Sequence, residues 1–343
     1  MGEYANVGWL LPAAIRKDQK VAIFAPSAPG LHRFSNRFRR GLDELERTLK
    51  REVFVPAYIE DTRLNKLAGT PIARAEGFNR LIADPTVGAI FTTYGGFNTN
   101  EILNFVDWGS AQSNPKCVVG YSDTTALLLA LATKTQLTTY YGPAVLPQFG
   151  EVGGILNFTA QELRATLVDG SPRRIPMLSE WYDQVQDWEQ RDEKREPIRD
   201  EGAFCAIPGE ATGRLFGGNA DTINYLVGTE FLKPPVEDTI LFLEMADAAA
   251  KWQAFRRSLV HLRDAGYLSC VKGIMIGRSP QTGSLEEMTD IFLDILPQPS
   301  TPVILNAPFG HFDPMATLPI GAIARIRSYK DDCSVETLTR SIK

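Results

Sequence analysis

The chain has 343 residues, of which 44% are hydrophobic and 22% are charged, a composition typical of globular proteins that bury a sizeable core. The length favours two domains. No apolar run approaches the roughly 18 residues that a membrane-spanning helix needs, so we expect no membrane segment. The formal net charge of -5 argues against the basic face that a nucleic-acid polymer requires, and we expect no such partner.

Targeting and metal-binding patterns are missing from the sequence. The first twenty residues lack the basic start, apolar block and cleavage site of a secretory signal, so we expect a cytoplasmic location. The four cysteines form no CxxC pair, which predicts free thiols and neither a disulfide framework nor a zinc site. A hydrolase that uses imidazole as a base has only three candidates, His32, His261 and His311.

The N-terminal part alternates short apolar runs with amphipathic stretches. Strands are predicted at 20–25, 87–92 and 117–120, and helices at 38–49, 77–82, 101–105 and 124–133. Such alternation indicates a parallel sheet with helices on both faces. We therefore predict an α/β fold with an N-terminal parallel-sheet domain over residues 1–168.

Between 171 and 201 this pattern gives way to a polar stretch rich in acidic residues and interrupted by Trp181, Tyr182 and Trp188. Such a stretch is either a solvated connection pinned to the surface by its aromatic side chains or a functional loop, because long loops in compact proteins often carry function. We expect an interdomain linker or lid over residues 169–208.

The C-terminal part, residues 209–343, is predicted to be a smaller α+β domain that is mostly β. Glycine and proline turns separate its elements. Strands are expected at 239–244, 273–276, 302–306 and 322–328, with a helix at about 248–265.

Ser122 lies in the segment CVVGYSDTT, between a buried strand and a helix, where the turn of a nucleophile elbow would sit. Its hydroxyl would project at the carboxyl end of the sheet, with the backbone N–H of Asp123 directed at the same point. The pattern is half an elbow, because Thr124 replaces the second glycine of G-x-S-x-G. A helix N-cap explains Ser122 just as well from sequence alone.

A second turn between a strand and a helix contains Gly95 and Gly96, in the run TTYGGFNTNE. Paired glycines let the backbone approach a ligand closely, and free N–H groups at such a turn favour an anion. The turn could supply the second half of an oxyanion hole. The alternative is a tight turn with Asn98 as the cap of the following helix.

His311 lies in the turn PFGHFDP, and Glu244 ends the apolar run TILFLE. A carboxylate at that position would be costly if buried without a partner, and a histidine can supply one. If both residues meet Ser122, Glu244 orients His311, and His311 takes the serine proton. This arrangement is a hypothesis, since the three residues are far apart in the chain.

Several segments resemble one family, the serine peptidases that include LD-carboxypeptidases and microcin C self-immunity proteins. They occur in the same order as in that family, and the resemblance extends over nearly the whole chain. The Gly-Gly-x-Asn-x-Asn form of residues 95–100 and the long aromatic-bearing loop resemble the microcin-immunity, MccF-like branch. The segments are VAIFAPSAP, GAIFTTYGGFNTN, VVGYSDTTALL, GRLFGGNADTINYLVGT, ILFLEMAD and NAPFGHFDPMATLPIGAIARI.

The resemblance implies Ser122 as nucleophile, His311 as general base and Glu244 as the acid that orients it. It also implies an oxyanion hole formed by backbone N–H groups at Gly96 and Asp123. The family fold would place the nucleophile on an N-terminal domain resembling class I glutamine amidotransferases, with the site at the interface of the two domains. A homodimer is also implied, and the mechanism needs no metal or cofactor.

Immunity proteins of this type hydrolyse the bond between a C-terminal aspartyl group and a nucleotide phosphoramidate, and related aminoacyl sulfamoyl adenosines. An aromatic residue of the interdomain loop stacks on the purine, a role suited to Trp188 or Trp181 because a base offers a flat π face. Arg278 could pair with a phosphate or carboxylate. Asn98 and Asn219 are the other candidate substrate contacts, although a simple turn also explains Asn219.

Two other functions stay open. The nearest keeps the chemistry but changes the small-molecule substrate, giving an LD-carboxypeptidase that removes the terminal D-alanine from a murein tetrapeptide. The other is a binding protein in which two α/β domains clamp a small ligand without turning it over. The presence of Ser122, Glu244 and His311 together argues against simple binding.

Overall fold

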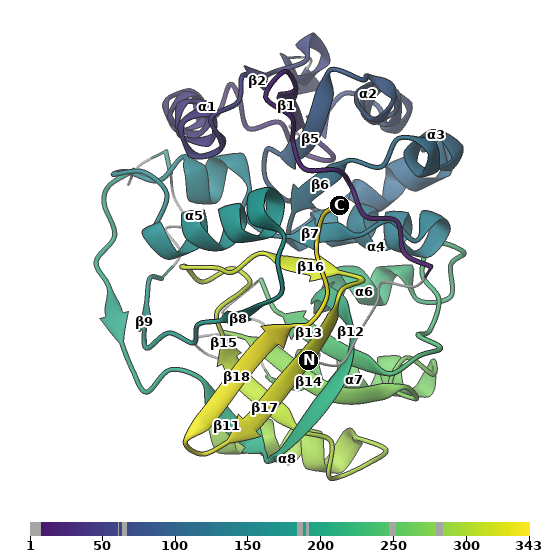
Figure 1. The fold of residues 1–343 in the computed structure, drawn as a ribbon, viewed down its shortest axis with the longest axis vertical. Helices are drawn as coiled ribbons and strands as arrows, with labels where there is room; N and C mark the ends of the chain where they lie inside the picture. The colour runs from purple at the N-terminus through teal and green to yellow at the C-terminus, as the bar shows by residue number, and fades with distance from the viewer. Residues whose placement is uncertain are drawn as a thin grey trace.

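Two β-sheets, one above the other in Figure 1, organise the chain. The structure is a computed structural model that describes residues 8–60, 62–63, 67–183, 188–189, 192–246, 252–278 and 284–343. A six-stranded sheet with its helices comes mainly from the N-terminal part, and a mostly β unit built on an eight-stranded sheet comes from the C-terminal part. This architecture confirms the predicted α/β fold class.

The six-stranded sheet has the order β16-β7-β6-β5-β1-β2, and its strands are parallel except that β16 is antiparallel to β7. Every residue of β5 is buried, as expected for a parallel strand covered on both faces. The strands are β1 (Lys20–Phe24), β2 (Val53–Phe54), β5 (Val87–Thr92), β6 (Cys117–Gly120), β7 (Thr139–Tyr141) and β16 (Leu318–Ile320).

Helices cover both faces of this sheet (Figure 1). In β1, Val21 and Ile23 belong to a core shared with α1 and α5, whereas Ala22 and Phe24 face the core beneath α2, α3 and α4. The helices are α1 (Ser35–Leu49), α2 (Pro71–Ala83), α3 (Trp108–Ser113), α4 (Thr125–Thr135) and α5 (Asn157–Arg164). Short helical turns and a small ladder complete this half: η1 (Ala57–Glu60), η3 (Thr99–Phe105), η4 (Ser122–Thr124), η5 (Val145–Phe149), η6 (Ala165–Asp169), β3 (Thr62–Arg63) and β4 (Leu67–Ala68).

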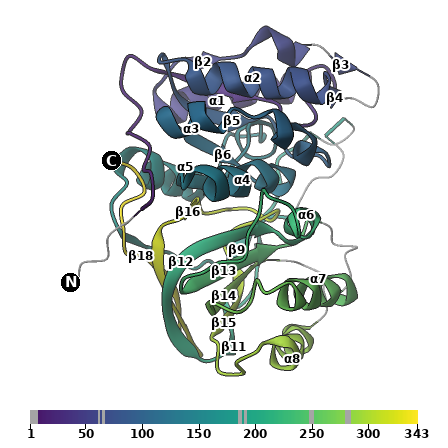
Figure 2. The same cartoon turned by 90° about the vertical axis from the view of Figure 1, so that its right-hand side faces the viewer.

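Helix α4 lies where the two sheets meet. Its sequence TALLLALATKT is apolar nearly all round, and a helix of this kind is expected to be buried. It contacts β6 and β7 on the side of the first sheet and β12 and α6 on the side of the second (Figure 2). None of the helices in the described ranges is long and apolar enough to cross a membrane.

The eight-stranded sheet has the order β11-β15-β14-β13-β12-β17-β18-β8, with parallel strands from β12 to β15 and antiparallel strands outside them. Helices α7 and α8 lie together on one side of it (Figure 2). The elements are β8 (Arg173–Ile175), β11 (Phe204–Ile207), β12 (Gly209–Asn219), β13 (Thr239–Glu244), β14 (Val271–Gly277), β15 (Val303–Ala307), β17 (Ile323–Tyr329), β18 (Asp332–Thr337), α6 (Ala220–Leu226), α7 (Trp252–Asp264) and α8 (Leu285–Ile295).

The segment expected to be a linker or lid, 169–208, has four strands among its described residues. β8 and β11 form the two opposite edges of the eight-stranded sheet, so the segment runs from one edge to the other. Between them, β9 (Glu180–Trp181) pairs with β10 (Ile198–Arg199). The domain boundaries at 168/169 and 208/209 stay predictions, as does the likeness to class I glutamine amidotransferases.

Most of the predicted helices and strands are present, but their first and last residues differ from the predicted ones. The helix expected at about 248–265 is α7, and residues 247–251 lie outside the described residues. The helix expected at 101–105 is the 3₁₀ helix η3. The sequence reading missed β16, a three-residue strand from the C-terminal part that joins the N-terminal sheet.

Candidate active site

Ser122 lies two residues after the end of β6, at the carboxyl end of the six-stranded sheet. Its φ of 60° places a non-glycine residue in the left-handed region, which is uncommon and typical of a strained nucleophile elbow. The N-cap residue of α4 is Thr124, and the Ser122 hydroxyl lies against His311. The alternative that Ser122 serves as a helix cap is therefore wrong.

A hydrogen-bonded chain joins Ser122, His311 and Glu244. Ser122 Oγ lies 3.0 Å from His311 Nε2, and His311 Nδ1 lies 2.6 Å from Glu244 Oε2. His311 is 8% exposed and Glu244 is fully buried. The three residues that the sequence hypothesis combined therefore do meet in the fold.

The turn that carries His311 comes very close to the strand that carries Glu244. Glu244 is the last residue of β13, and His311 lies between β15 and β16. Gly310 has a φ of 101°, and a Cβ at this position would lie only 2.9 Å from Cβ of Glu244. Glycine is therefore required here both for the backbone conformation and for the close approach.

Glu244 accepts two further hydrogen bonds on its other carboxylate oxygen. The Tyr141 hydroxyl donates to Oε1 at 2.7 Å, and Asn219 Nδ2 donates to it at 2.9 Å. Burial alone would raise the pKa of Glu244, but the charge of His311 and the hydrogen bonds outweigh it and hold the pKa below its ordinary value. The carboxylate is therefore ionised at neutral pH and can stabilise a protonated His311.

Two asparagines suggested as substrate contacts have partners inside the protein. Asn219 donates to Glu244, and its Oδ1 caps α6. Asn98 is buried, and its side chain lies between the Ser27 hydroxyl and the Glu101 carboxylate. Asn98 does occupy the N-cap position of η3, but its side chain makes no capping hydrogen bond.

Asp123, next to the serine, fixes the turn at residues 95–100. Its Oδ2 accepts hydrogen bonds from the Asn98 N–H at 3.0 Å and from the Thr99 N–H and hydroxyl at 2.9 and 2.7 Å. Burial raises the pKa of Asp123, and these hydrogen bonds only partly oppose the rise. The nucleophile turn and the glycine turn are therefore held as one unit.

Gly95 lies close against the nucleophile and lines the cavity beside it. A Cβ added there would lie 2.8 Å from Ser122 Oγ and 3.4 Å from the backbone nitrogen of Asp123. Glycine at this position therefore avoids a clash with the hydroxyl and crowding of the amide.

A cavity of about 300 Å³ opens beside Ser122 and His311. One wall is aromatic, with ring centroids between 5.2 and 6.4 Å apart, and consists of Phe34, Tyr94 and Trp188. The remaining lining residues are Arg33, Gly95, Gly96, Tyr121 and Pro147.

Of the two tryptophans predicted as substrate contacts, Trp188 lines this cavity. The Arg37 guanidinium lies 4.5 Å from the centre of its indole ring. Trp181 is elsewhere, with the Arg278 guanidinium 5.2 Å from its ring centre. Arg278 is buried in an ion pair with Asp200, so the structure does not bring either Trp181 or Arg278 to the cavity.

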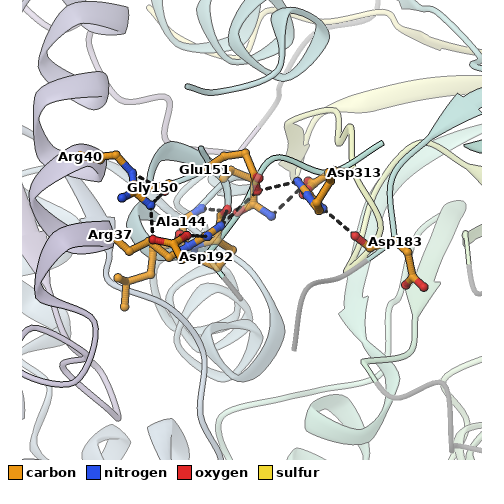
Figure 3. Close-up of polar contacts among 12 residues, drawn as sticks. Arg37, Arg40, Ala144, Gly150, Glu151, Asp183, Asp192 and Asp313 are labelled. Atoms are coloured by element: carbon orange, nitrogen blue, oxygen red, sulfur yellow. Dashed lines mark hydrogen bonds and ion pairs between the residues drawn. The ribbon is translucent and has the colours of Figure 1, made fainter. Parts of the chain in front are cut away.

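Three arginines and three carboxylates form a charged network beside the cavity (Figure 3). It joins α1, the segment after Trp188 and the turn that carries His311. Buried charges need partners of opposite sign, and here the two signs balance. The ion pairs are Arg37–Glu151, Arg37–Asp192, Arg40–Asp192, Arg195–Glu151 and Arg195–Asp313.

Sequence reasoning missed this network, Tyr141, and the two residues that join Trp188 in the aromatic wall, Phe34 and Tyr94. One signal was available, because Arg37 lies four residues before Gly41 and eight before Leu45, on the buried face of α1. An arginine on a buried helix face indicates an internal ion pair. No comparable sequence signal identifies Tyr141, which is the last residue of the buried strand β7.

A serine hydrogen-bonded to a histidine, itself bonded to a buried ionised carboxylate, is the arrangement of the serine hydrolases. The histidine can accept the serine proton, and the carboxylate fixes the imidazole and stabilises its charged form. The fold and the site together define an enzyme of this class.

The comparisons with known proteins agree. Residues 21–142 match the LD-carboxypeptidase N-terminal domain, and residues 212–326 match the LD-carboxypeptidase C-terminal domain. The chain is 30% identical over 320 residues to a putative carboxypeptidase of Vibrio cholerae, covering 91% of this chain and 93% of that protein. It is also 30% identical over 319 residues to the microcin C7 self-immunity protein MccF of Escherichia coli, covering 91% of each.

Among solved structures, an MccF-like protein from Bacillus anthracis has a TM-score of 0.88 at 33% identity, covering 96% of this chain and 100% of that one. The chain belongs to the LD-carboxypeptidase family, a family of carboxypeptidase-type hydrolases, which confirms the resemblance found in the sequence.

Proposed function

We propose that Ser122 is the nucleophile of a serine hydrolase, with His311 as its general base and Glu244 as the residue that orients His311. The observation that supports this is the hydrogen-bonded chain from Ser122 Oγ through the imidazole to the buried carboxylate. As Oγ attacks the substrate carbonyl, His311 takes its proton and then passes it to the leaving group. A water molecule then attacks the acyl group on Ser122 in the same way, with His311 as the base, and releases it.

The oxyanion of the tetrahedral intermediate is stabilised by the backbone N–H groups of Gly96 and Asp123. The close approach of Gly95 to Ser122 supports this assignment, because it brings the glycine turn beside both Ser122 Oγ and the Asp123 nitrogen, and Gly96 and Ser122 line the same cavity. The Asp123 carboxylate binds the N–H groups of Asn98 and Thr99 and so fixes the turn that carries Gly96. A donor in a fixed turn needs no reorganisation when charge develops, which is the condition for effective electrostatic stabilisation.

The substrate is an aminoacyl or peptidyl nucleotide, cleaved at the bond between the C-terminal acyl group and the nucleotide. MccF has been solved in complex with aspartyl sulfamoyl adenosine, and that structure has a TM-score of 0.87 to this chain at 28% identity. In this chain, Phe34, Tyr94 and Trp188 line the cavity with aromatic rings that pack edge to face, and Trp188 offers a flat face on which a nucleobase would stack. Arg33 also lines the cavity, where it forms an ion pair with Glu189 at 2.7 Å, and a phosphate or sulfamoyl group would take the place of that carboxylate.

A second candidate substrate is a murein tetrapeptide, from which the same chemistry would release the terminal D-alanine. The chain is 24% identical over 333 residues to a probable murein peptide carboxypeptidase of Bacillus subtilis. Arg33 would then exchange its ion pair with Glu189 for one with the peptide carboxylate, and the aromatic wall would have no base to bind.

A product assay by mass spectrometry separates the two substrates. The purified protein is given aspartyl sulfamoyl adenosine and an L,D-murein tetrapeptide in separate reactions, with Ser122→Ala as the matched control. We expect free aspartate from the first and no product from the second. Release of D-alanine alone would assign the murein reaction, and turnover that survives in Ser122→Ala would exclude Ser122 as nucleophile.

A further inference from the structure

Arg195 connects the segment that follows Trp188 to the turn that carries His311. Its Nη2 lies 2.8 Å from Asp313 Oδ2 and 2.9 Å from Glu151 Oε2. The Arg195 side chain is 9% exposed and that of Asp313 is 4% exposed, so the pair is shielded from water and from screening by salt. Figure 3 shows Asp313 on one side of Glu151 and the α1 residues Arg37 and Arg40 on the other.

Asp313 is tied to the catalytic histidine in two ways. It lies two residues after His311 in the same turn, and its Oδ1 accepts a hydrogen bond from Gln148 Nε2 at 3.2 Å. The same Nε2 donates to the Tyr121 hydroxyl at 3.4 Å. The Tyr121 ring packs on the imidazole of His311 with centroids 4.9 Å apart. A shift of Asp313 would therefore reach His311 both through the backbone and through the ring on which it rests.

Asp313 depends on Arg195 for its counter-ion. If the guanidinium were removed, Glu151 would keep its ion pair with Arg37, whereas the remaining side-chain hydrogen bond to Asp313 comes from the neutral amide of Gln148. A buried carboxylate left without a counter-ion is strongly unfavourable. The turn would have to move Asp313 towards water, and His311 would move with it.

We infer that Arg195 is a positioning residue for His311, acting through Asp313, so that the segment that brings Trp188 to the cavity also holds the general base in place. This inference rests on the proposed function, since it assigns a role to a residue behind the base. Neither Arg195 nor Asp313 touches the reacting atoms.

The test measures the reactivity of Ser122 separately from substrate binding. A fluorophosphonate probe forms a bond from Ser122 Oγ to phosphorus and expels fluoride while His311 accepts the proton, and it needs no contact with Trp188. The labelling rate, kcat and KM are measured for wild type, Arg195→Met, Arg195→Lys and Asp313→Asn. Arg199→Met is the matched control, because Arg199 lies in the same segment in an exposed ion pair with Glu180.

We expect Arg195→Met to lower both the labelling rate and kcat by about tenfold or more, with a smaller change in KM, because small misplacement of a base is costly. Arg195→Lys should recover part of the loss, and Arg199→Met should match wild type. The double variant Arg195→Met/Asp313→Asn should be no slower than the slower single variant, because the two residues act as one pair.

A folded Arg195→Met protein that is labelled at the wild-type rate would overturn the inference, as would full additivity of the two substitutions. If Arg195→Met does not fold, Asp313→Asn, which keeps the side-chain shape, decides the same question. Failure of the proposed function looks different, because wild type itself would then resist the probe and leave both substrates intact.

Discussion

The Tyr141 hydroxyl donates a 2.7 Å hydrogen bond to Glu244 Oε1, and this bond joins the carboxyl ends of two strands from different sheets. Tyr141 ends β7 of the six-stranded sheet, and Glu244 ends β13 of the eight-stranded sheet. The same hydroxyl accepts a long hydrogen bond, 3.5 Å, from the Ser122 N–H. One phenol therefore links the acid of the proposed triad to the backbone of its nucleophile.

Replacing Tyr141 with phenylalanine should lower kcat by about tenfold and the free energy of unfolding by about 1 kcal/mol, since one buried hydrogen bond is lost. Glu244 keeps its bond from Asn219, so the loss should be partial. Steady-state kinetics and denaturant unfolding measure the two effects. Tyr140→Phe is the control, because the Tyr140 hydroxyl is equally buried but bonds to the Ser341 carbonyl, away from the site. Equal losses of kcat in both variants would contradict a specific role for Tyr141.

The parts of the site that the sequence predicted are those carried by local patterns. Ser122 follows a continuous apolar strand, and Glu244 is a carboxylate at the end of one, so each stands out beside its neighbours. His311 is one of only three histidines. The residue types alone combine these three signals into one hypothesis, the family resemblance implies the same three residues, and the geometry supports it.

The parts that could not be predicted depend on packing between distant segments. Trp188 and Trp181 are similar residues in one polar stretch, and only the fold shows that Trp188 faces the cavity. Asn219 is predicted as a substrate contact from the family resemblance, and its bond to Glu244 left no signal in the sequence, because only the pairing of β12 with β13 brings the two residues together. The three residues of β16 are too few to show a period, so their crossing to the other sheet left no signal in the sequence.

The two tryptophans give a matched pair for the nucleotide hypothesis. Trp188→Ala should raise KM for aspartyl sulfamoyl adenosine by about 10- to 100-fold, because stacking on a base contributes about 1 to 3 kcal/mol. Trp181→Ala should leave KM near the wild-type value, since Trp181 lies outside the cavity, beneath Arg278. Unchanged KM in the Trp188 variant would remove the support for base stacking and favour the murein substrate.

The lowered pKa of Glu244 predicts how stability depends on pH. The folded protein holds the pKa of this carboxyl below its ordinary value of 4.5. On acidification, the carboxyl is therefore protonated in the unfolded chain before it is protonated in the folded protein. The contribution of Glu244 to stability is therefore full above about pH 4.5 and is lost as the pH falls through the folded-state value. Unfolding curves at several pH values should show wild type losing more stability on acidification than Glu244→Gln, which cannot titrate. Parallel curves for the two proteins would show that the carboxylate is not held in its ionised form.

The left-handed backbone conformation of Ser122 predicts that an inactive glycine variant is more stable than an inactive alanine variant. A non-glycine residue at a φ of 60° costs about 1 kcal/mol relative to glycine, and the surrounding turn maintains that strain. Ser122→Gly and Ser122→Ala should both lose the nucleophile and fall by about 10⁴- to 10⁶-fold in turnover. Only Ser122→Gly also relieves the strain, so its melting temperature should exceed that of Ser122→Ala. Calorimetry of the two inactive variants makes the comparison, and equal melting temperatures would mean that the turn holds no strain at the nucleophile.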